Sequence, residues 1–476
     1  MSDPNDRLEA LLPSVVSVVT VSDAPDYEQP WQTTGPRQSS GSGAIIETAH
    51  GKRVLTNAHC AENAVFIEVR RYGRSTRFVA HVEAIGHECD LAILKVDDAA
   101  FYEGANPLPI GALPHLGDKV QVCGFPIGGE RLSVTEGLVS RIELVHYAQA
   151  QRRLLAVQID AAINSGNSGG PVLKDGVLVG VAFQSLVGAD RIGQSIAAPV
   201  VKHFIEDVAD GVYDGFPAVG VTIQRLESKS HRRFLGLPDD LEGGVIVLDV
   251  VYGGSAWGIL EKGDVLLEVS GVPIASDGTV PLRGGERVGF DYVVSRAQIG
   301  EALSLKVSRA GELHDCALTL KDASQLVAED RYEVPPSYYV VGGLLLVPLT
   351  RDYLKTWGTH FWHDAPRDLV LLYERGLKTP DRFQPVVLQK VLADRLNQGY
   401  HDFANLLVEK AQGEPVRSLT HLVELIEDGD APYIELDLAG GRRVVLARDE
   451  ALERHEVILE RFGVPADRSA DLPRLA

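Results

Sequence analysis

The sequence predicts a mostly β chain in which a large all-β block precedes two smaller mixed blocks. From residue 14 to about residue 205, short apolar runs such as RLLAVQID, KVQVCGF and GVLVGVAF follow one another, with Gly, Pro and Asp in the gaps. No helical period separates these runs, which is typical of an all-β barrel or sandwich. The length of 476 residues is enough for about three domains of roughly 150 residues each.

Two stretches rich in Gly and Pro divide the chain. ADGVYDGFP at 209–217 ends the all-β block, so we place the first domain at 14–207, after an N-terminal segment at 1–13. In EVPPSYY, the pair Pro335-Pro336 cannot continue a helix or a central strand, and it marks the second boundary. The remaining parts are a first mixed domain at 215–325, a second at 337–447 and a C-terminal tail at 448–476.

The two mixed blocks share one order of elements. In the first, KGDVLLEVSGVPI predicts a strand and a glycine turn, RVGFDYVVSRA predicts a helix, and ALSLKVSRAGELHDCALTL predicts a hairpin that turns at Ala310-Gly311. In the second, NLLVEKAQGEPVRSLTHLVELIED repeats a strand, a glycine turn and a helix, which suggests an internal duplication. The tail DEALERHEVILERFG predicts a solvated helix.

Composition and charge restrict the function classes. The 66 acidic residues outnumber the 46 basic ones, and no dense Lys/Arg cluster occurs, which argues against a nucleic-acid partner. No apolar run approaches the ~18 residues of a membrane span. The N-terminus also lacks the features of a signal peptide. We therefore expect a cytoplasmic protein, unless a targeting segment was removed.

Cysteine and histidine usage points to neither a disulfide framework nor a metal site. The four cysteines are too few and too irregularly spaced for a framework and fit a reducing compartment. His360 and His363 have helical i, i+3 spacing, but no third ligand is evident. We expect no metal and no cofactor.

The stretch AAINSGNSGGPVLKDG places Ser168 among glycines between two apolar strands. A serine hydroxyl attacks a carbonyl only if a base accepts its proton and nearby donors stabilise the oxyanion. Glycines suit this because they permit unusual backbone angles and close approach of the substrate. GNSGG also fits the nucleophile elbow of α/β-hydrolases, but that motif precedes a helix. Here a strand, a turn and another strand follow, with Pro171 three residues after the serine, so we reject the elbow.

Two further segments supply the partners that such a serine needs. RVLTNAHCAENA puts His59 at the end of an apolar strand, and HECDLAILKV puts Asp90 at the start of another. Each residue alone has an ordinary alternative, His59 as a surface histidine at a strand end and Asp90 as a turn residue at the start of a strand. The order His, Asp, Ser, with separations of 31 and 78 residues, fits a two-barrel arrangement in which the first barrel carries His and Asp.

TNAHC, DLAILKV and DAAINSGNSGGPV resemble the three active-site segments of the HtrA/Deg serine proteases, which are trypsin-like enzymes with PDZ domains. PWQTTGPRQSSGSGAII and FPIGGERLSVTEGLVS are similar to further segments of their protease domain. DGTVPLRGGERVGFDYVVS resembles the first PDZ domain of the plant-type Deg proteases, and NLLVEKAQGEPVRSLTHLVELIED their divergent second one. The resemblance covers nearly the whole chain. It implies a chymotrypsin-like double β-barrel protease domain followed by two α+β PDZ domains.

Site residues follow from the same resemblance. It implies His59 as general base, Asp90 as its orienting group and Ser168 as nucleophile, with the backbone N–H groups of Gly166, Asn167 and Ser168 around the oxyanion. The implied substrate pocket is lined by Ile163, Val181, Ala182 and Phe183. These walls imply a preference for a small or medium apolar P1 residue.

TNAHC also resembles digestive trypsin-like proteases, in which the cysteine after the histidine forms a disulfide. The partner should lie just before the opening strand, where this chain has QSSGSG. We therefore expect Cys60 to be a free thiol.

PDZ domains bind a peptide C-terminus as an added strand, with a backbone loop around the carboxylate. The resemblance implies that this loop is AVGV, formed by Ala218, Val219, Gly220 and Val221. Ala218 departs from the larger residue usual at the first position, and a plain opening strand is the alternative. The second PDZ domain has no comparable loop before LLLVPLT, which favours a role in assembly.

We expect an ATP-independent serine endopeptidase that degrades unfolded or damaged proteins through an acyl-enzyme. The expected partners are unfolded polypeptides, peptide C-termini at the first PDZ domain, and copies of the chain in a homotrimer or hexamer. The alternative is a non-catalytic PDZ scaffold or a chaperone that holds misfolded proteins. The presence of all three catalytic residues and the neighbouring glycines argues against it.

Overall fold

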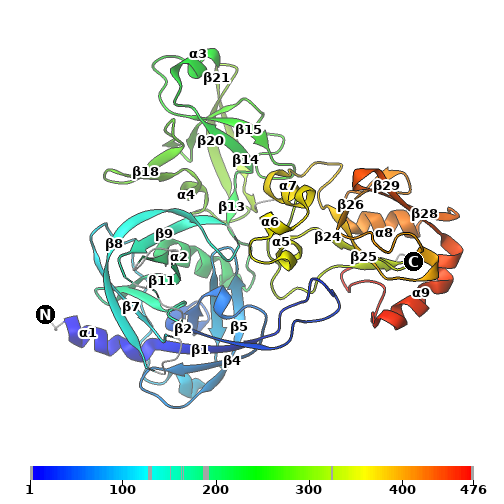
Figure 1. Ribbon diagram of the computed structural model, residues 1–476. Coiled ribbons are helices and arrows are strands. Elements are labelled where there is room, and N and C mark those ends of the chain that lie inside the picture. The colour runs from blue at the N-terminus through cyan, green and yellow to red at the C-terminus, as the bar shows by residue number, and fades with distance from the viewer. Residues whose placement is uncertain are drawn as a thin grey trace. The chain divides into compact units, whose positions relative to one another are not determined.

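The computed structural model describes residues 4–126, 131–150, 152–161, 163, 166–185, 192–322 and 325–472. The chain divides into two compact units, and Figure 1 labels many of their elements. Unit 1 comprises Met1–Asp23 and Pro36–Ala323, and unit 2 comprises Ala24–Gly35 and Ser324–Ala476. A short loop of the N-terminal region thus belongs with the C-terminal part of the chain.

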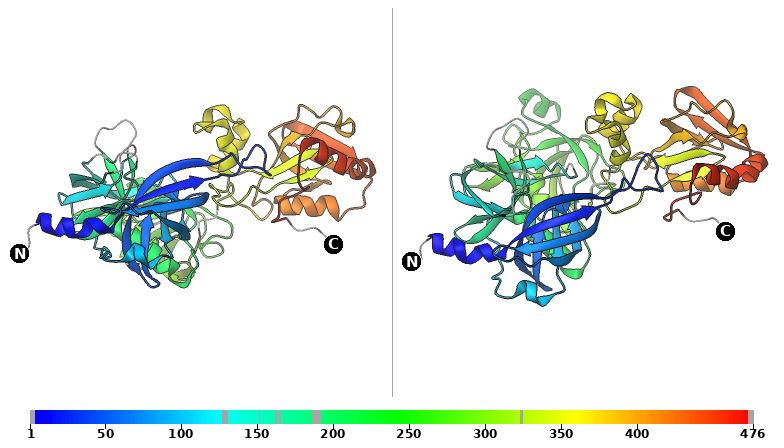
Figure 2. Two further views of the ribbon diagram at one scale, coloured as in Figure 1. Left: turned by 90° about the horizontal axis from the view of Figure 1, so that it is seen from below. Right: turned by 60° about the horizontal axis from the view of Figure 1, so that its bottom comes forward.

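Six antiparallel strands close the first barrel of unit 1 in the order β1-β2-β3-β6-β5-β4. They are β1 (Val15–Ser22), β2 (Arg37–Thr48), β3 (Gly51–Thr56), β4 (Ala64–Arg71), β5 (Phe78–Gly86) and β6 (Leu91–Lys95). The long β1–β2 hairpin is drawn in dark blue in Figure 2. Alternate residues such as Val16, Val18 and Ile45 fill the barrel interior, as the period of two in a strand requires.

The second barrel has the order β10-β11-β12-β9-β8-β7. Its strands are β7 (Lys119–Gly124), β8 (Ser133–His146), β9 (Arg153–Ile159), β10 (Pro171–Lys174), β11 (Val177–Ser185) and β12 (Gly193–Ala197). Helix α1 (Pro4–Leu11) precedes the barrels and α2 (Ala198–Asp207) follows them. The predicted chymotrypsin-like double barrel is confirmed, and the sandwich alternative is wrong because each sheet closes on itself.

The rest of unit 1 is an α+β region. Its main sheet has the order β14-β15-β16-β20-β21, with β14 at one edge; β13 pairs with β22, and β18 with β19. The elements are β13 (Pro217–Ala218), β14 (Val221–Arg225), α3 (Lys229–Phe234), β15 (Val245–Val250), β16 (Val265–Val269), β17 (Val272–Pro273), β18 (Thr279–Arg283), β19 (Glu286–Gly289), α4 (Asp291–Val294), β20 (Ala302–Arg309), β21 (Glu312–Thr319) and β22 (Lys321–Asp322).

Local expectations for this region are partly confirmed. The predicted hairpin turns at Ala310 and Gly311, which have φ values of 52° and 88°. The helix predicted over RVGFDYVVSRA is shorter than expected, because its first residues form β19, which pairs with β18. Only α4 remains helical.

Unit 2 contains a sheet with the order β23-β24-β25-β26-β28-β29, in which β27 pairs with β26. Its elements are β23 (Tyr339–Val341), β24 (Leu344–Pro348), α5 (Arg351–Leu354), α6 (Phe361–Asp364), α7 (Arg367–Arg375), β25 (Val386–Val391), β26 (Leu406–Ala411), β27 (Glu414–Pro415), α8 (Leu419–Glu427), β28 (Tyr433–Leu438), β29 (Arg442–Ala447) and α9 (Arg448–Phe462). The predicted tail helix is α9, but it is not wholly solvated, since Ile458 and Leu459 are buried.

Both mixed regions contain a short hairpin of the same kind, and the internal duplication itself stays a prediction. The turn between β16 and β17 has Ser270 and Gly271 at positive φ, and the turn between β26 and β27 has Gln412 and Gly413 at positive φ. In unit 2, α8 follows the hairpin directly, whereas in unit 1 the β18–β19 pair intervenes. No helix within the described ranges is long and apolar enough to cross a bilayer.

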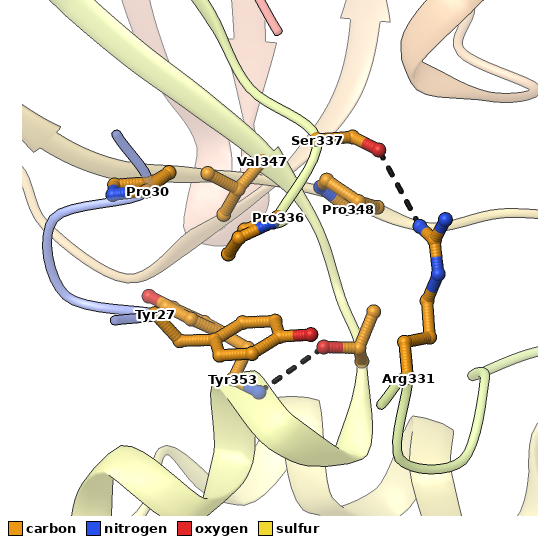
Figure 3. Close-up of a pocket in the computed structure, with 9 residues that line it drawn as sticks. Tyr27, Pro30, Arg331, Pro336, Ser337, Val347, Pro348 and Tyr353 are labelled. Carbon is orange, nitrogen blue, oxygen red and sulfur yellow. Dashed lines mark hydrogen bonds between the residues drawn. The ribbon is translucent and has the colours of Figure 1, made fainter. Parts of the chain in front are cut away.

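Residues 24–35 pack against the C-terminal part of unit 2. The side-chain amide of Gln389 donates to the carbonyl oxygens of Tyr27 (3.0 Å) and Glu28 (3.2 Å). The Trp31 ring meets Tyr338 edge to face, with centroids 5.6 Å apart. Figure 3 shows the small cavity beside this contact, where Tyr27 lies next to Tyr353. The cavity is lined by Tyr27, Pro30, Arg331, Pro336, Ser337, Val347, Pro348, Thr350 and Tyr353.

Candidate active site

Asp90 and His59 are in direct contact in the first barrel. Asp90 immediately precedes β6 and has φ of 53°, and His59 lies in the short 3₁₀ turn Ala58–Cys60 that follows β3. His59 Nδ1 is 2.8 Å from Oδ2 and 3.0 Å from Oδ1 of Asp90. The backbone N–H of His59 donates to Oδ1 at 3.0 Å, and the side-chain amide of Asn57 donates to the Asp90 carbonyl at 2.8 Å. These contacts fix the carboxylate against one edge of the imidazole.

The electrostatics of the pair favour a basic imidazole. Asp90 is buried, with 2% of its surface exposed. Burial acts to lower the pKa of His59, but the Asp90 carboxylate and then the neighbouring Cys60 thiol outweigh it, so the pKa is raised well above its ordinary value. A carboxylate at Nδ1 assigns the proton of the neutral ring to that nitrogen, which leaves Nε2 as the acceptor. An imidazole held in this way can remove a proton from an alcohol.

Ser168 lies in the segment before β10, beside strand β2. Its carbonyl oxygen accepts the N–H of Ser42 at 2.8 Å, and the thiol of Cys60 lies 3.7 Å from the same oxygen. The residue next to His59 therefore touches the main chain of Ser168. The Ser168 hydroxyl donates to the carbonyl of Phe183 at 3.4 Å, and within the described residues no hydrogen bond joins it to His59. The structure brings the three segments together with the hydroxyl turned toward Phe183.

The amides expected around the oxyanion belong to a tightly held segment. Gly166 has φ of 96°, and its carbonyl accepts the Ser42 hydroxyl at 2.7 Å. The carbonyl of Asn167 accepts the Gly170 N–H at 2.9 Å. The N–H groups of Gly166, Asn167 and Ser168 donate to no other group in the described part of the chain.

Of the residues expected to line the substrate pocket, Ala182 and Phe183 contact the serine segment. Ile163 is buried, and a Cβ placed on Gly193 would lie 2.4 Å from its Cγ1. Val181 and Ala182 are fully buried in the barrel core, and the Ala182 carbonyl accepts the Gly169 N–H. Phe183 supplies the acceptor for Ser168, and its ring centroid lies 4.6 Å from that of Tyr147. Their role in substrate preference stays a prediction.

All four cysteines are free thiols, as expected for Cys60. A Cβ placed on Gly41 of β2 would lie 2.5 Å from the Cys60 sulfur. The position facing this thiol is therefore a glycine, and the sulfur fills the space that a side chain there would need. No group of three or more His, Cys, Asp or Glu side chains able to hold a metal occurs in the parts of the chain that the structure describes.

The loop expected to hold a peptide carboxylate joins β13 to β14. Its carbonyl oxygens are occupied by the turn at 251–256, which donates from the Ser255 hydroxyl to Ala218 (2.5 Å), from Ala256 N–H to Val219 and from Val251 N–H to Gly220. Gly220 has φ of 76°, and Val221 begins the edge strand β14. In unit 2, the corresponding edge of β24 is covered by β23, with Tyr339 opposite Leu346.

Two further contacts near the site were not expected from the sequence. The hydroxyl of Ser42 links β2 to the segment of Gly166. The Gln149 side chain of the second barrel donates to Glu62, three residues after His59, at 2.5 Å. Burial raises the pKa of Glu62, which the bond from Gln149 and the charge of His59 oppose. The only feature of the sequence that could have indicated the Glu62 contact is its position three residues after His59. Polar residues in loops are common, so this position alone does not predict a contact.

Comparison with known proteins gives a consistent result. A family model described as a trypsin-like peptidase domain matches residues 41–181, and one described as a PDZ domain matches 327–471. Protease Do-like 4, mitochondrial, of Arabidopsis thaliana is 38% identical over 460 residues, covering 96% of this chain and 85% of that protein. Protease Do-like 2, chloroplastic, of the same plant is 37% identical over 472 residues, covering 97% and 76%.

A solved structure shares the fold. The HtrA-type protease AlgW with a decapeptide superimposes with a TM-score of 0.50 at 23% identity, covering 70% of this chain and all of that one. At this level of identity the likeness concerns the fold alone.

Proposed function

This chain belongs to the HtrA/Deg family of trypsin-like serine proteases with PDZ domains, and from that premise we propose that it cleaves unfolded or damaged proteins through an acyl-enzyme. The observation that supports the mechanism best is the contact of His59 Nδ1 with both carboxylate oxygens of Asp90. A protease needs such an arrangement to keep the imidazole oriented while it exchanges protons with the serine.

Ser168 is the proposed nucleophile. Rotation about its χ1 bond takes the hydroxyl from the Phe183 carbonyl, a long 3.4 Å contact, to His59 Nε2. The hydroxyl proton then passes to Nε2 as Oγ bonds to the substrate carbonyl carbon. The imidazolium returns that proton to the leaving amine as the C–N bond breaks. Water then attacks the acyl-enzyme carbonyl as His59 accepts its proton. The imidazolium returns that proton to Oγ as the ester C–Oγ bond breaks, which releases the acid and restores the Ser168 hydroxyl.

The oxyanion formed in both steps needs donors that are already in place. The backbone N–H groups of Gly166, Asn167 and Ser168 support this role, since none of them donates to another residue that the structure describes. For P1 recognition we propose Ile163, Val181, Ala182 and Phe183 as the pocket region and a small or medium apolar side chain as its ligand. The close packing of Ile163 on Gly193 supports a shallow pocket.

For peptide binding we propose the loop from Ala218 to Val221 together with β14. A PDZ ligand adds as a strand to a free sheet edge, and β14 has such an edge in the order of strands. An HtrA-type relative was solved with a decapeptide. In unit 2, β23 occupies the equivalent edge, which supports a role in assembly for that domain.

Assembly into a homotrimer or hexamer is part of the proposal. The exposed apolar side chains of Val65, Phe66 and Val79 on neighbouring strands β4 and β5 support an interface on the first barrel. The free thiols of all four cysteines support a reducing compartment.

The test is digestion of unfolded casein by the wild type and by Ser168→Ala, each at equal concentration and with its mass measured in solution. We expect the wild type to cleave casein and the variant to leave it intact. Cleavage by both proteins would contradict the assignment of Ser168, and cleavage by neither would contradict the proposed activity. A labelling reaction with a fluorophosphonate, which bonds covalently to an activated serine, reports on the nucleophile without a protein substrate.

A further inference from the structure

Ser42 of β2 uses every polar atom it has at the boundary between the two barrels. Its side chain is fully buried. The ladder between β2 and β3 begins at Ala44, so the main chain of Ser42 lies beyond that ladder. Its N–H donates to the Ser168 carbonyl at 2.8 Å, and its own carbonyl accepts the Thr56 hydroxyl at 2.7 Å.

The hydroxyl of Ser42 makes two more bonds, both to the second barrel. It donates to the carbonyl of Gly166 at 2.7 Å and accepts the N–H of Phe125 at 2.7 Å. Both bonds are buried. One residue of the first barrel therefore holds the segment of the nucleophile at two carbonyl groups, those of Gly166 and Ser168.

The backbone of two glycines, Gly124 and Gly169, packs closely against Ser42. A Cβ on Gly124 would lie 2.9 Å from the Ser42 hydroxyl, and a Cβ on Gly169 would lie 2.1 Å from the Ser42 carbonyl. Gly169 also has φ of 82°, which side-chain-bearing residues rarely adopt. Glycine is therefore needed at positions 124 and 169, where a larger side chain would collide with Ser42.

Gly166 itself needs an external constraint. A glycine is free to rotate about its backbone bonds, and its N–H is one of the proposed oxyanion donors. Because a peptide unit is planar, a bond that fixes the Gly166 carbonyl also fixes the Asn167 N–H, which points the opposite way. An oxyanion donor that is misplaced by about 1 Å costs up to ~100-fold in rate.

We propose that Ser42 is a positioning residue for catalysis, which sets the orientation of the Gly166–Ser168 segment through its hydroxyl and its N–H. This inference rests on the proposed protease function of that segment. The described hydrogen bonds of Ser42 involve neither the Ser168 hydroxyl nor the His59 imidazole, so the loss of its side chain should lower kcat and leave KM nearly unchanged.

The experiment compares Ser42→Ala with Ser14→Ala in the full chain. Ser14 is a matched control because it is also fully buried and its hydroxyl donates to one backbone carbonyl, that of Asn106, at 2.5 Å. For Ser42→Ala we expect kcat on a fluorogenic peptide, and the rate of fluorophosphonate labelling, to fall roughly 10- to 100-fold. KM should stay within about twofold. The melting temperature should fall more than in Ser14→Ala, because the Ser42 hydroxyl makes two buried hydrogen bonds and the Ser14 hydroxyl makes one.

Ser42→Cys is a second variant, which keeps the side-chain shape but donates only a weak hydrogen bond. It tests the proposal if Ser42→Ala does not fold. We expect it to melt near the wild type and to lose kcat nonetheless. Wild-type kcat in either folded Ser42 variant, or an equal loss of kcat in Ser14→Ala, would overturn the proposal. A wild type that is itself inactive and unlabelled would instead contradict the protease function.

Discussion

Glu88 and Arg152 form an ion pair that connects the segment of Asp90 to the start of the PDZ-like region of unit 1. Arg152 Nε lies 3.3 Å from Oε2 of Glu88, and its Nη2 donates to the carbonyl oxygens of Phe216 (2.6 Å) and Pro217 (2.7 Å). These carbonyls directly precede the expected peptide loop. Burial raises the pKa of Glu88 to about 7, against the opposing charge of Arg152.

This pKa predicts a stability change near neutral pH. Between the ordinary glutamate value and about 7, the folded state holds a proton that the unfolded state has lost, so the free energy of unfolding falls as pH rises through that interval. Glu88→Gln should remove this contribution and flatten the curve, by on the order of 1–3 kcal/mol between pH 5 and 8. Urea unfolding at a series of pH values measures it. Glu136→Gln, at an exposed glutamate paired with Lys119, is the control, and equal curves for the wild type and Glu88→Gln would contradict the prediction.

The variant Asp90→Asn tests whether Asp90 orients the His59 imidazole and raises its pKa. Because Asp90 and Cys60 raise the pKa of His59, we expect the activity of the wild type to begin at a higher pH than an ordinary imidazole would give. The same pair stabilises the fold below the unfolded pKa of histidine and loses that contribution as pH rises through the folded pKa. If Asp90 orients His59 as proposed, we expect kcat of Asp90→Asn to fall by about 10³- to 10⁴-fold and the remaining activity to begin at lower pH. A pH profile of kcat/KM that keeps its wild-type midpoint would contradict this assignment.

The sequence predicts most of the fold and the identity of the main site segments, because both can be recognised from short stretches of neighbouring residues. His59, Asp90 and Ser168 each lie near a strand end within a few residues of recognisable neighbours, and their order fits a two-barrel arrangement. The hairpin at Ala310-Gly311 could be predicted in the same way, because a turn with two positive φ values depends on the adjacent residues themselves.

Contacts between distant segments could not be predicted in this way. Ser42 and Gly166 are 124 residues apart, and Tyr27 and Gln389 are 362 apart. Serine and glutamine occur in loops and strands for many ordinary reasons, so the residue type alone does not indicate which distant residue it contacts. The turn of the Ser168 hydroxyl toward Phe183 depends on one side-chain rotation, which no pattern of residues encodes.

Ile163→Ala is expected to change the P1 preference. The Ile163 side chain fills the space beside Gly193, so its truncation should deepen the proposed pocket. The ratio of kcat/KM for a peptide with Phe at P1 to one with Ala at P1 should rise about tenfold. Ile142→Ala is the matched control, because Ile142 is equally buried in β8 of the same barrel. If both variants alter the ratio alike, or neither does, Ile163 does not shape the pocket.

Unit 2 should depend on the short loop at its surface. Residues 24–35 contribute the Trp31 ring to Tyr338, and the Tyr27 and Glu28 carbonyls to Gln389, so the loop buries surface that the C-terminal part alone would expose. Trp31→Ala should lower the free energy of unfolding of unit 2 by about 1–3 kcal/mol, since a partly buried aromatic ring is lost. Trp362→Ala, at a tryptophan with 47% of its surface exposed in α6, should cost less than about 1 kcal/mol. Calorimetry of the full chain separates the two units if they melt independently, and hydrogen exchange in β23 and β25 assigns the effect to unit 2. Equal losses in the two variants would show that the loop adds no more than any surface aromatic residue does.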